Sequence, residues 1–180
     1  MEFGKLNLIP ARERPDLVAE SVAEGLKSIT PGDIYIAEID PSLAGTKEFC
    51  EHYEIPVDHA ANCVVVEATR GDRKWFAACV VLGATRADIN GLVRRYLDGR
   101  KVSFASMDEA LQKTRMMYGG ITPVGLPTDW PILVDSAIVA LDKVVVGGGG
   151  RSSKLVLSGK ILSELPNAVV LEGLGFRSES

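Results

Sequence analysis

The sequence predicts a single α+β domain, and three observations support this expectation. The chain has 180 residues, close to the ~100–200 residues of one domain. Short apolar runs rich in β-branched residues, which are typical of strands, alternate with segments of helical periodicity. Two of these runs are adjacent and joined by a short turn. The pattern therefore favours α+β over a regular strand–helix–strand repeat.

Composition excludes several classes of protein. Apolar residues make up 46% of the chain, charged residues 24%, and the net charge is −4, which is ordinary for a folded domain and wrong for a disordered one. No apolar run approaches the ~18 residues of a bilayer span, and residues 1–5 lack the start of a secretory signal. We therefore expect no membrane partner.

The three cysteines are irregularly spaced and include no CxxC pair, so we expect neither a bound metal nor a disulfide framework. Cys63 and Cys79 lie in apolar runs, where a reduced thiol packs as a small hydrophobe. Reduced thiols are typical of the cytoplasm, where we expect this protein to be located.

Two helices are expected near the N-terminus. Pro15 precedes apolar residues at helical spacing up to Ile29, and Pro31-Gly32 follows, which predicts one helix with proline early and glycine after its end. Asp40-Pro41-Ser42 predicts the start of a second helix, whose apolar side includes Phe49.

A β-hairpin is expected next. The run Cys63–Ala68 predicts a buried strand, and Lys74–Leu82 a second one after a turn at residues 70–73. A helix is expected from about Arg86 to Leu97. Another is expected from Met107 to about Arg115, because the preceding serine and a glutamate three residues later match a capping box.

The C-terminal third contains a Gly/Pro-rich stretch from Gly119 to Pro127 that cannot form regular structure. The remaining expected elements are short: strands at Ile132–Val134, Val144–Val146 and Leu155–Leu157, a helix at Ser158–Glu164, and a last strand at Ala168–Leu171.

Two glycine-rich segments are candidates for chemistry. The first runs Gly119-Gly120-Ile121-Thr122-Pro123-Val124-Gly125 and the second Gly147-Gly148-Gly149-Gly150-Arg151. Glycine has no side chain to hold a ligand away, so amide N–H groups can point into a concave site and bind a phosphate or an oxyanion. Alternatively both segments are only tight turns, and the residues alone leave the two interpretations open.

Other catalytic patterns are weak. No Gly-Lys-Ser/Thr follows either glycine segment, and no GxGxxG opens a helix near the N-terminus, so neither a Walker A loop nor a dinucleotide site is expected. The chain has only two histidines, His52 and His59, which offer no helical i,i+4 pair for zinc.

Basic residues gather in two stretches of the chain. One contains Arg94-Arg95 and Arg100-Lys101, the other Arg70, Arg73 and Lys74. They are either solvated faces of a slightly acidic protein or contacts for RNA phosphates.

The glycine segments resemble the YbaK family, trans-acting aminoacyl-tRNA deacylases related to the editing insertion of bacterial prolyl-tRNA synthetase. Residues 119–125 match the family pattern Gly-Gly-Ile/Val-Ser/Thr-Pro-hydrophobic-Gly. Residues 132–135 resemble its apolar strand ending in Asp, residues 144–151 its strand and glycine-rich turn, and residues 61–66 its first core strand. The resemblance spans about residues 45–172.

The resemblance implies a single α+β domain around a mixed, barrel-like β-sheet surrounded by helices. Residues 1–40 would then be an N-terminal helical extension packed on the domain, residues 41–174 the YbaK-like deacylase domain, and residues 175–180 a flexible tail. It also implies hydrolysis of the ester that joins a mischarged amino acid to tRNA, without a cofactor. The expected partners are the aminoacylated 3′ end of tRNA and an aminoacyl-tRNA synthetase.

The resemblance also assigns roles within the site. An aminoacyl ester is already activated, so it needs a positioned water and oxyanion donors, each worth on the order of 10²–10³ in rate. Asn62, Gly119 and Gly120 are expected to be catalytic. The expected substrate-binding residues are Cys63, Ile121, Thr122, Pro123, Asp135, Gly147, Gly148, Gly149 and Arg151.

Three positions depart from the family pattern. At one of them, Gly147, relatives often have serine. Asn62 stands where the family has a lysine, and Cys63 where it often has threonine. Asparagine can bond a carbonyl or a ribose hydroxyl but supplies no positive charge. The resemblance therefore leaves two functions open, an editing deacylase or a degenerate module that binds aminoacyl or nucleotide ligands without hydrolysis. An unrelated interaction protein, in which the glycine segments are only turns, is the third possibility.

Overall fold

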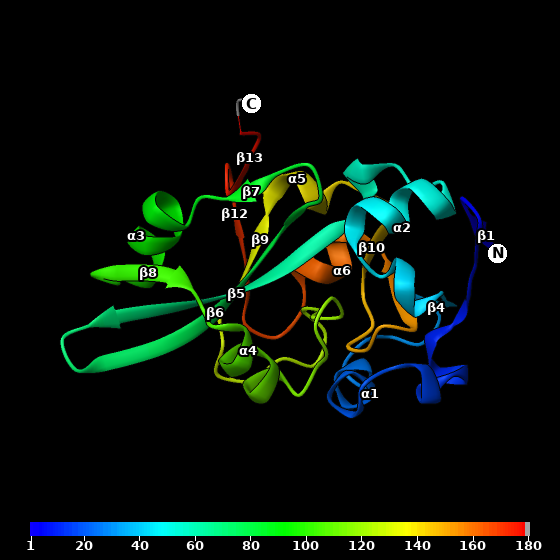
Figure 1. The fold of residues 1–180 in the computed structure, drawn as a ribbon, viewed down its shortest axis with the longest axis horizontal. Coiled ribbons are helices and arrows are strands. Elements are labelled where there is room, and N and C mark those ends of the chain that lie inside the picture. The colour runs from blue at the N-terminus through cyan, green and yellow to red at the C-terminus, as the bar shows by residue number, and fades with distance from the viewer. Residues whose placement is uncertain (179–180) are drawn as a thin grey trace.

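Two β-sheets form the centre of the fold (Figure 1). The computed structural model describes residues 1–178. The first sheet is antiparallel throughout. Its strands lie in the order β10 (Val144–Gly147), β11 (Ser153–Leu157), β4 (Ile34–Glu38) and β3 (Ile9–Pro10).

The second sheet is mixed and contains the expected hairpin. β5 and β6 pair antiparallel through a turn in which Gly71 has φ 59°, whereas β9 is parallel to both of its neighbours. Its strands lie in the order β12 (Ala168–Leu171), β9 (Ile132–Asp135), β6 (Arg73–Leu82), β5 (Ala61–Arg70) and β8 (Lys101–Phe104).

These sheets confirm the expected α+β class in one domain, but they do not close into a barrel. Within residues 1–178 the two sheets keep separate strand orders, and an isolated bridge between Ala60 and Val145 joins them. Two further pairs are small: β1 (Glu2–Phe3) with β2 (Leu6–Asn7), and β7 (Arg86–Ala87) with β13 (Gly175–Phe176).

The α-helices are short and lie around the sheets (Figure 1). The expected capping box is present, because the Ser106 hydroxyl accepts the Glu109 N–H at 3.2 Å. The helices are α1 (Glu20–Leu26), α2 (Thr46–Tyr53), α3 (Arg94–Leu97), α4 (Met107–Thr114), α5 (Ser136–Val139) and α6 (Gly159–Ser163).

Two expected helices are interrupted. The one from Pro15 to Ile29 is broken at Val18, whose backbone is extended, because the next amide, of Ala19, donates to Gly148 O at 3.2 Å. The one from Arg86 begins later, because β7 occupies its first two residues. Asp88 then caps a π-helical turn by accepting the Gly91 and Leu92 N–H groups at 3.0 Å.

The N-terminal segment is more than a helical extension. Its strand β4 lies between β11 and β3, inside the first sheet. At the other end, Gly175 and Phe176 pair with β7, so these two residues of the expected tail belong to a strand. Residues 179–180 of that tail lie outside the described residues.

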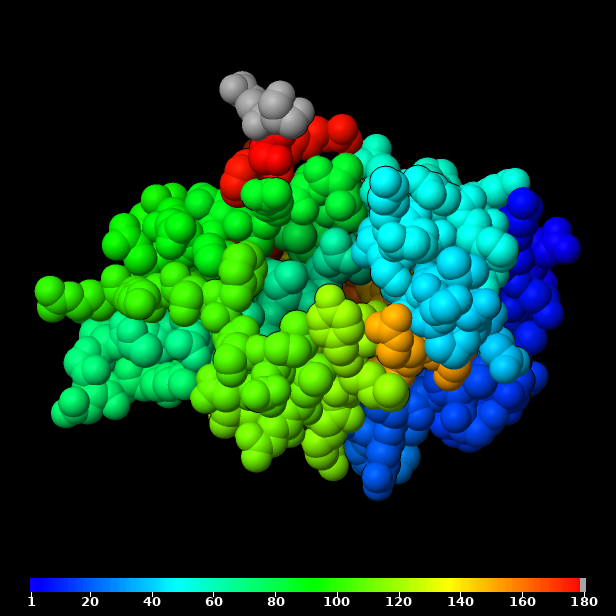
Figure 2. Space-filling model, in the orientation of Figure 1, coloured from blue at the N-terminus to red at the C-terminus, as the bar shows by residue number. Residues whose placement is uncertain are grey.

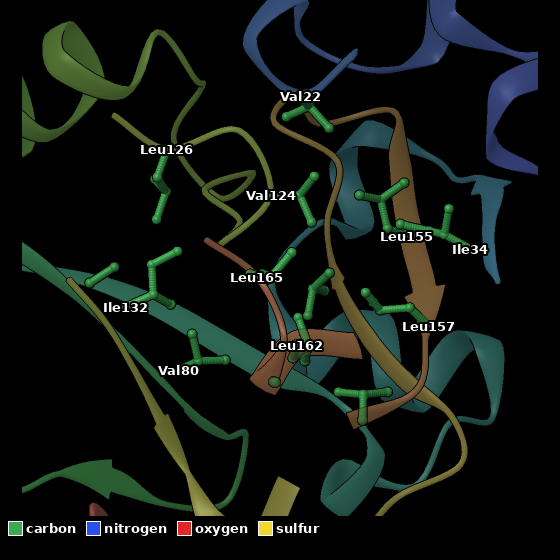
Figure 3. Packing of buried hydrophobic residues seen from close by; sticks show 14 of the residues in the cluster. Val22, Ile34, Val80, Val124, Leu126, Ile132, Leu155, Leu157, Leu162 and Leu165 are labelled. Carbon is green, nitrogen blue, oxygen red and sulfur yellow. The ribbon is translucent and has the colours of Figure 1, made fainter. Parts of the chain in front are cut away.

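The largest apolar cluster joins the two sheets, α1 and the loop after α4 (Figure 3). Val22, Ile34 and Leu155 are at most 1% exposed on the first-sheet side, and Val80 is fully buried on the second. Burying such a side chain contributes roughly 1.5–3 kcal/mol. Val124, 1% exposed, anchors the first glycine segment in the same core.

Candidate active site

The two glycine-rich segments lie in direct contact. The Gly149 N–H donates to Gly120 O at 2.8 Å, and the Met117 N–H donates to Gly149 O at 2.7 Å. The Gly120 N–H donates to Met117 O at 2.9 Å. The two segments therefore converge, but the amides of Gly120 and Gly149 already donate to carbonyls inside the protein.

Glycine is required here because the two backbones touch. A Cβ on Gly120 would lie 2.2 Å from Gly150 O, and one on Gly147 would lie 2.5 Å from Gly120 O. Gly149 also has φ 87°, a conformation that costs a side-chain-bearing residue extra strain. No larger residue fits at Gly120 or Gly147 without moving one segment away from the other.

The N-terminal segment supports the second glycine segment from behind. Besides the Ala19–Gly148 bond, the Ser153 hydroxyl donates to Leu17 O at 2.6 Å. A Cβ on Gly149 would lie 2.6 Å from Ala19 Cβ. This packing positions the glycine turn and explains the break in the predicted first helix.

Arg151 joins the two glycine segments to the turn that precedes α2. Its Nη1 donates to Tyr118 O at 2.9 Å, and its Nη2 donates to Pro41 O at 3.1 Å. The guanidinium carbon also lies 6.0 Å from the centre of the Tyr118 ring. Both bonds go to backbone carbonyls, so this expected substrate-binding residue holds the loops together.

Lys154 is a site residue that sequence reasoning missed. Its side chain extends from β11 toward the same turn, where Nζ donates to Ala44 O at 3.0 Å and lies 5.3 Å from the Phe49 ring centre. Lys154 is only 8% exposed, and burial lowers its pKa to about 8. The available signal was a single lysine in an otherwise apolar strand directly after the glycine turn.

Asn62 lies at the start of β5 and is connected to α2. Its Oδ1 accepts the Thr46 hydroxyl at 2.8 Å. Among residues 1–178 no acceptor is found for its Nδ2 hydrogens. The side chain is half-buried, so its amide hydrogens remain available to a ligand.

A hollow opens between these elements (Figure 2). In the space-filling view it is bordered by the cyan segment containing α2 and by the yellow-green loop that includes the first glycine segment. Teal β5 forms part of its floor, and the orange glycine turn lies at its rim. The expected catalytic residues Asn62, Gly119 and Gly120 belong to segments that border this hollow.

Cys63 does not share the environment of Asn62. Successive side chains of a strand point to opposite faces of the sheet. Cys63 packs against the main core, whereas Asn62 bonds to α2. Burial raises the pKa of the Cys63 thiol and that of Cys79 to about 12, which keeps both protonated and unreactive. The two side chains at 62 and 63 therefore cannot line one side of a pocket together.

Asp135 has a structural role at the end of β9. Its Oδ1 accepts the Ala137 N–H at 3.4 Å and caps α5, and its Oδ2 accepts the Gly175 N–H at 3.2 Å. This carboxylate is 4% exposed and holds the C-terminal strand. Both carboxylate oxygens accept backbone amides, so the contacts seen here give Asp135 a structural role, and its expected role in substrate binding stays a prediction.

The other residues of the first glycine segment point into the protein. Ile121 packs against the main core. Thr122 is fully buried, and its Oγ1 has no hydrogen-bond partner among the described residues. Pro123 lines a separate cavity of about 480 Å³ between α1, the end of α4 and the Gly125–Thr128 loop. The loop thus presents Gly119 to the surface and keeps the next residues inside.

No group of three or more His, Cys, Asp or Glu residues that could hold a metal occurs among residues 1–178. None of the helices in that part of the chain has the length and apolarity needed to cross a bilayer.

Comparison with known proteins places this arrangement in a family. The aminoacyl-tRNA editing domain family matches residues 40–165. The chain belongs to this family. Its editing domain is similar to the uncharacterized protein YwhH of Bacillus subtilis, with 26% identity over 129 residues that cover 72% of this chain and 79% of YwhH. The family match over residues 40–165 contains both glycine segments and Asn62.

Solved structures show the same fold. A proposed trans-editing enzyme for prolyl-tRNA synthetase aligns with TM-score 0.72 and 24% identity, over 84% of this chain and 93% of that one. The hypothetical protein APE2540 aligns with TM-score 0.75 and 24% identity, over 87% of this chain and 100% of that one. The family match over residues 40–165 confirms the resemblance to YbaK-like proteins, and these structures show the same fold.

Proposed function

We propose that this editing-domain protein is a trans-acting deacylase, which hydrolyses the ester between a wrongly attached amino acid and the 3′ end of tRNA. The observation that carries the proposal is the direct contact of the two glycine segments beside the Asn62 hollow. A synthetase that must discriminate one methylene gains only about 1–3 kcal/mol from its binding pocket. Removal of the wrong product by a second protein supplies the missing fidelity.

The oxyanion donors in this proposal are the glycine N–H groups that do not donate to a carbonyl within the protein. Gly120 and Gly149 spend their N–H groups inside the protein, which revises our expectation for Gly120. Among residues 1–178, no acceptor is found for the N–H groups of Gly119 and Gly148. In this proposal Gly119, which is exposed, donates to the developing oxyanion, and Gly148, although buried, supplies the second N–H group that has no acceptor.

Asn62 orients the substrate in place of the family lysine. Because its Oδ1 is held by Thr46, its Nδ2 is left as a donor to the ester carbonyl or to a ribose hydroxyl. A positioned water forms a bond from its oxygen to the acyl carbon, the acyl–oxygen bond breaks, and a proton from the water passes to the departing oxygen. The products are the free amino acid and the tRNA hydroxyl. Arg151 and Lys154 act indirectly by holding the turn before α2 against the glycine segments.

The proposed partners follow from this chemistry. Aminoacylated tRNA is the substrate, and a synthetase that produces the mischarged tRNA would be an associated protein. Translation takes place in the cytoplasm, so the protein would act there.

The test is a deacylation panel across mischarged tRNAs with matched variants at position 62. We expect wild type to release free amino acid from at least one tRNA. Asn62→Ala should lose about 10²-fold in rate, as expected for one catalytic donor. Thr46→Ser, which keeps the hydroxyl, should retain activity, whereas Thr46→Val should reduce it.

Asn62→Lys separates the deacylase from the degenerate module. If the parent is inert on every tRNA and Asn62→Lys is active, the protein is a binding module and the proposal is wrong. Gly120→Val is unsuitable as a probe, because any Cβ at this position collides with Gly150 O. It would displace the whole turn rather than remove one donor.

A further inference from the structure

The two basic stretches of the sequence form one surface in the fold. β8 pairs with β5 so that Lys101 lies opposite Thr69, and the Arg100 N–H donates to Thr69 O at 2.9 Å. Arg70 donates through Nε to Asp98 O at 2.8 Å. The hairpin tip, α3 and β8 therefore make up one end of the molecule, which we call the basic end and define as residues 70–74 and 94–101 (Figure 1).

The charge of the basic end opposes that of the rest of the protein. Its two stretches contain seven Lys or Arg residues and two Asp residues, a net charge of +5 in a chain whose total is −4. The remainder of the protein is therefore strongly acidic. A surface of this sign in an acidic protein attracts a polyanion at one end and repels it elsewhere.

Most of these cations have no acidic partner. In residues 1–178 the salt bridges at the basic end join Arg70 to Asp98, and Lys74 to Glu67 and Glu109. The exposed cations outside these pairs are Arg73, Arg94, Arg95, Arg100 and Lys101. Their charges are thus uncompensated within the described chain.

Aromatic groups accompany the charges. The Arg73 guanidinium carbon lies 4.9 Å from the Trp75 ring centre. Tyr96 on α3 is 44% exposed. Phe104, at the opposite end of β8 from Lys101, is 60% exposed and lies beside the basic end. Cations combined with exposed aromatic faces suit a nucleic acid better than an acidic peptide. The cations attract its phosphates, and its unpaired bases can stack on aromatic rings.

We propose that the basic end binds the phosphate backbone of tRNA, at a site separate from the hollow in which the ester is cleaved. The proposal rests on the function proposed above for its choice of RNA. β5 connects the two sites, because Asn62 lies near its start and Arg70 at its end. Figure 2 shows the hollow and the hairpin on the same face of the molecule.

The length of β5 sets the distance between the two sites, and so the length of RNA that lies between them. The eight residue steps between Asn62 and Arg70 span about 26 Å at the usual strand rise. In duplex DNA each strand has one phosphate about every 3.4 Å of axis. At a comparable spacing in RNA, this separation corresponds to roughly eight nucleotides. The basic end therefore meets the acceptor stem while the 3′ end enters the hollow.

The experiment compares two double variants with equal changes of charge. Arg95→Gln/Lys101→Gln removes two charges from the basic end. Lys27→Gln/Lys160→Gln removes one charge directly after α1 and one from α6, where both side chains are at least 73% exposed. Binding of uncharged tRNA is measured by fluorescence anisotropy across a salt series, and hydrolysis is measured with mischarged tRNA and with a mischarged aminoacyl-adenosine ester.

The expected result is specific to the basic end. Affinity for tRNA should fall about tenfold at 0.1 M salt in the basic-end variant, and the slope of log K against log salt should decrease by about 2. KM should rise for mischarged tRNA while kcat/KM for the short ester stays unchanged. The α1/α6 variant should match wild type in every assay.

Equal losses in both double variants, or no loss in either, would overturn the proposal. The binding measurement uses uncharged tRNA, so it also distinguishes this proposal from the proposed function. If wild type hydrolyses neither ester but the basic-end variant alone loses tRNA binding, the RNA surface stands and the deacylase does not. Unchanged thermal unfolding of both variants would exclude misfolding as the cause.

Discussion

Lys154 gives a specific prediction about stability. Holding its charged side chain in a buried site lowers the free energy of unfolding, and this cost disappears when the lysine loses its proton at high pH. Its pKa is lowered from 10.5 to about 8, and the largest cause is burial. The folded state therefore holds the proton more weakly than the unfolded state does. Between pH 8 and 10.5 the unfolded chain binds more protons, so unfolding free energy rises with pH in this window.

The magnitude follows from the size of the shift. A difference of about 2.5 pKa units integrates to a gain of about 2.5 kcal/mol between pH 7 and pH 10, at ~1.36 kcal/mol per unit. Lys154→Met keeps the length of the side chain without its charge, and should lack this gain. It also leaves Ala44 O without its donor, a cost of about 1–3 kcal/mol that does not depend on pH.

The assay is urea unfolding of wild type and Lys154→Met at pH 7, 8, 9 and 10. The difference between the two proteins isolates Lys154, because the other titrating groups are common to both. Wild type should gain about 1 M in midpoint relative to the variant from pH 7 to pH 10, for a slope near 2 kcal/mol/M. A difference that stays constant across this range would refute the buried, depressed lysine.

Three further predictions concern the glycine contact, Asp135 and the cysteines. Gly120→Ala should destabilise the protein by about 1–3 kcal/mol in urea unfolding, because the new Cβ meets Gly150 O. The control Gly150→Ala should change stability by less than about 0.5 kcal/mol, because its Cβ meets only Met117 Sδ, at 3.8 Å. Equal effects of the two variants would contradict the backbone contact. Asp135→Ala should cost about 1 kcal/mol through loss of the α5 cap and leave deacylation unchanged, so a large loss of kcat in the folded variant would restore Asp135 to the site. All three cysteines are free thiols, and burial raises the pKa of each. An aromatic disulfide reagent at pH 8 should therefore react slowly with the native protein and quickly with three thiols in urea. Rapid labelling of the native protein would contradict the burial.

The fold was predictable wherever local pattern and long-range packing agree. The β5–β6 hairpin and the capped helix α4 follow from apolar runs, a turn and a capping pair. The break at Val18 was not predictable in this way, because its cause is an acceptor more than a hundred residues away, Gly148 O. Strand β4 was missed for a similar reason, since its partner β11 is distant in sequence.

The candidate site was predictable in its glycines but not in its hydrogen bonds. The motif at residues 119–125 indicated a glycine-rich loop with available amides, yet only the structure shows that the Gly120 N–H donates to Met117 O and that the two segments touch. The capping role of Asp135 was not predictable, because a carboxylate after a strand looks the same in sequence whether it binds a ligand or caps a helix. Lys154 escaped notice because its burial depends on the turn before α2.

The most direct test of the central claim is an NMR titration of the backbone amides with a non-hydrolysable aminoacyl-adenosine analogue. If the glycine amides left over from the contact receive the substrate, the resonances of Gly119 and Gly148 should shift on binding, together with the Asn62 side-chain amide. The Ala137 amide, held by Asp135, should stay in place. Saturated binding that leaves Gly119 and Gly148 unmoved would contradict the account.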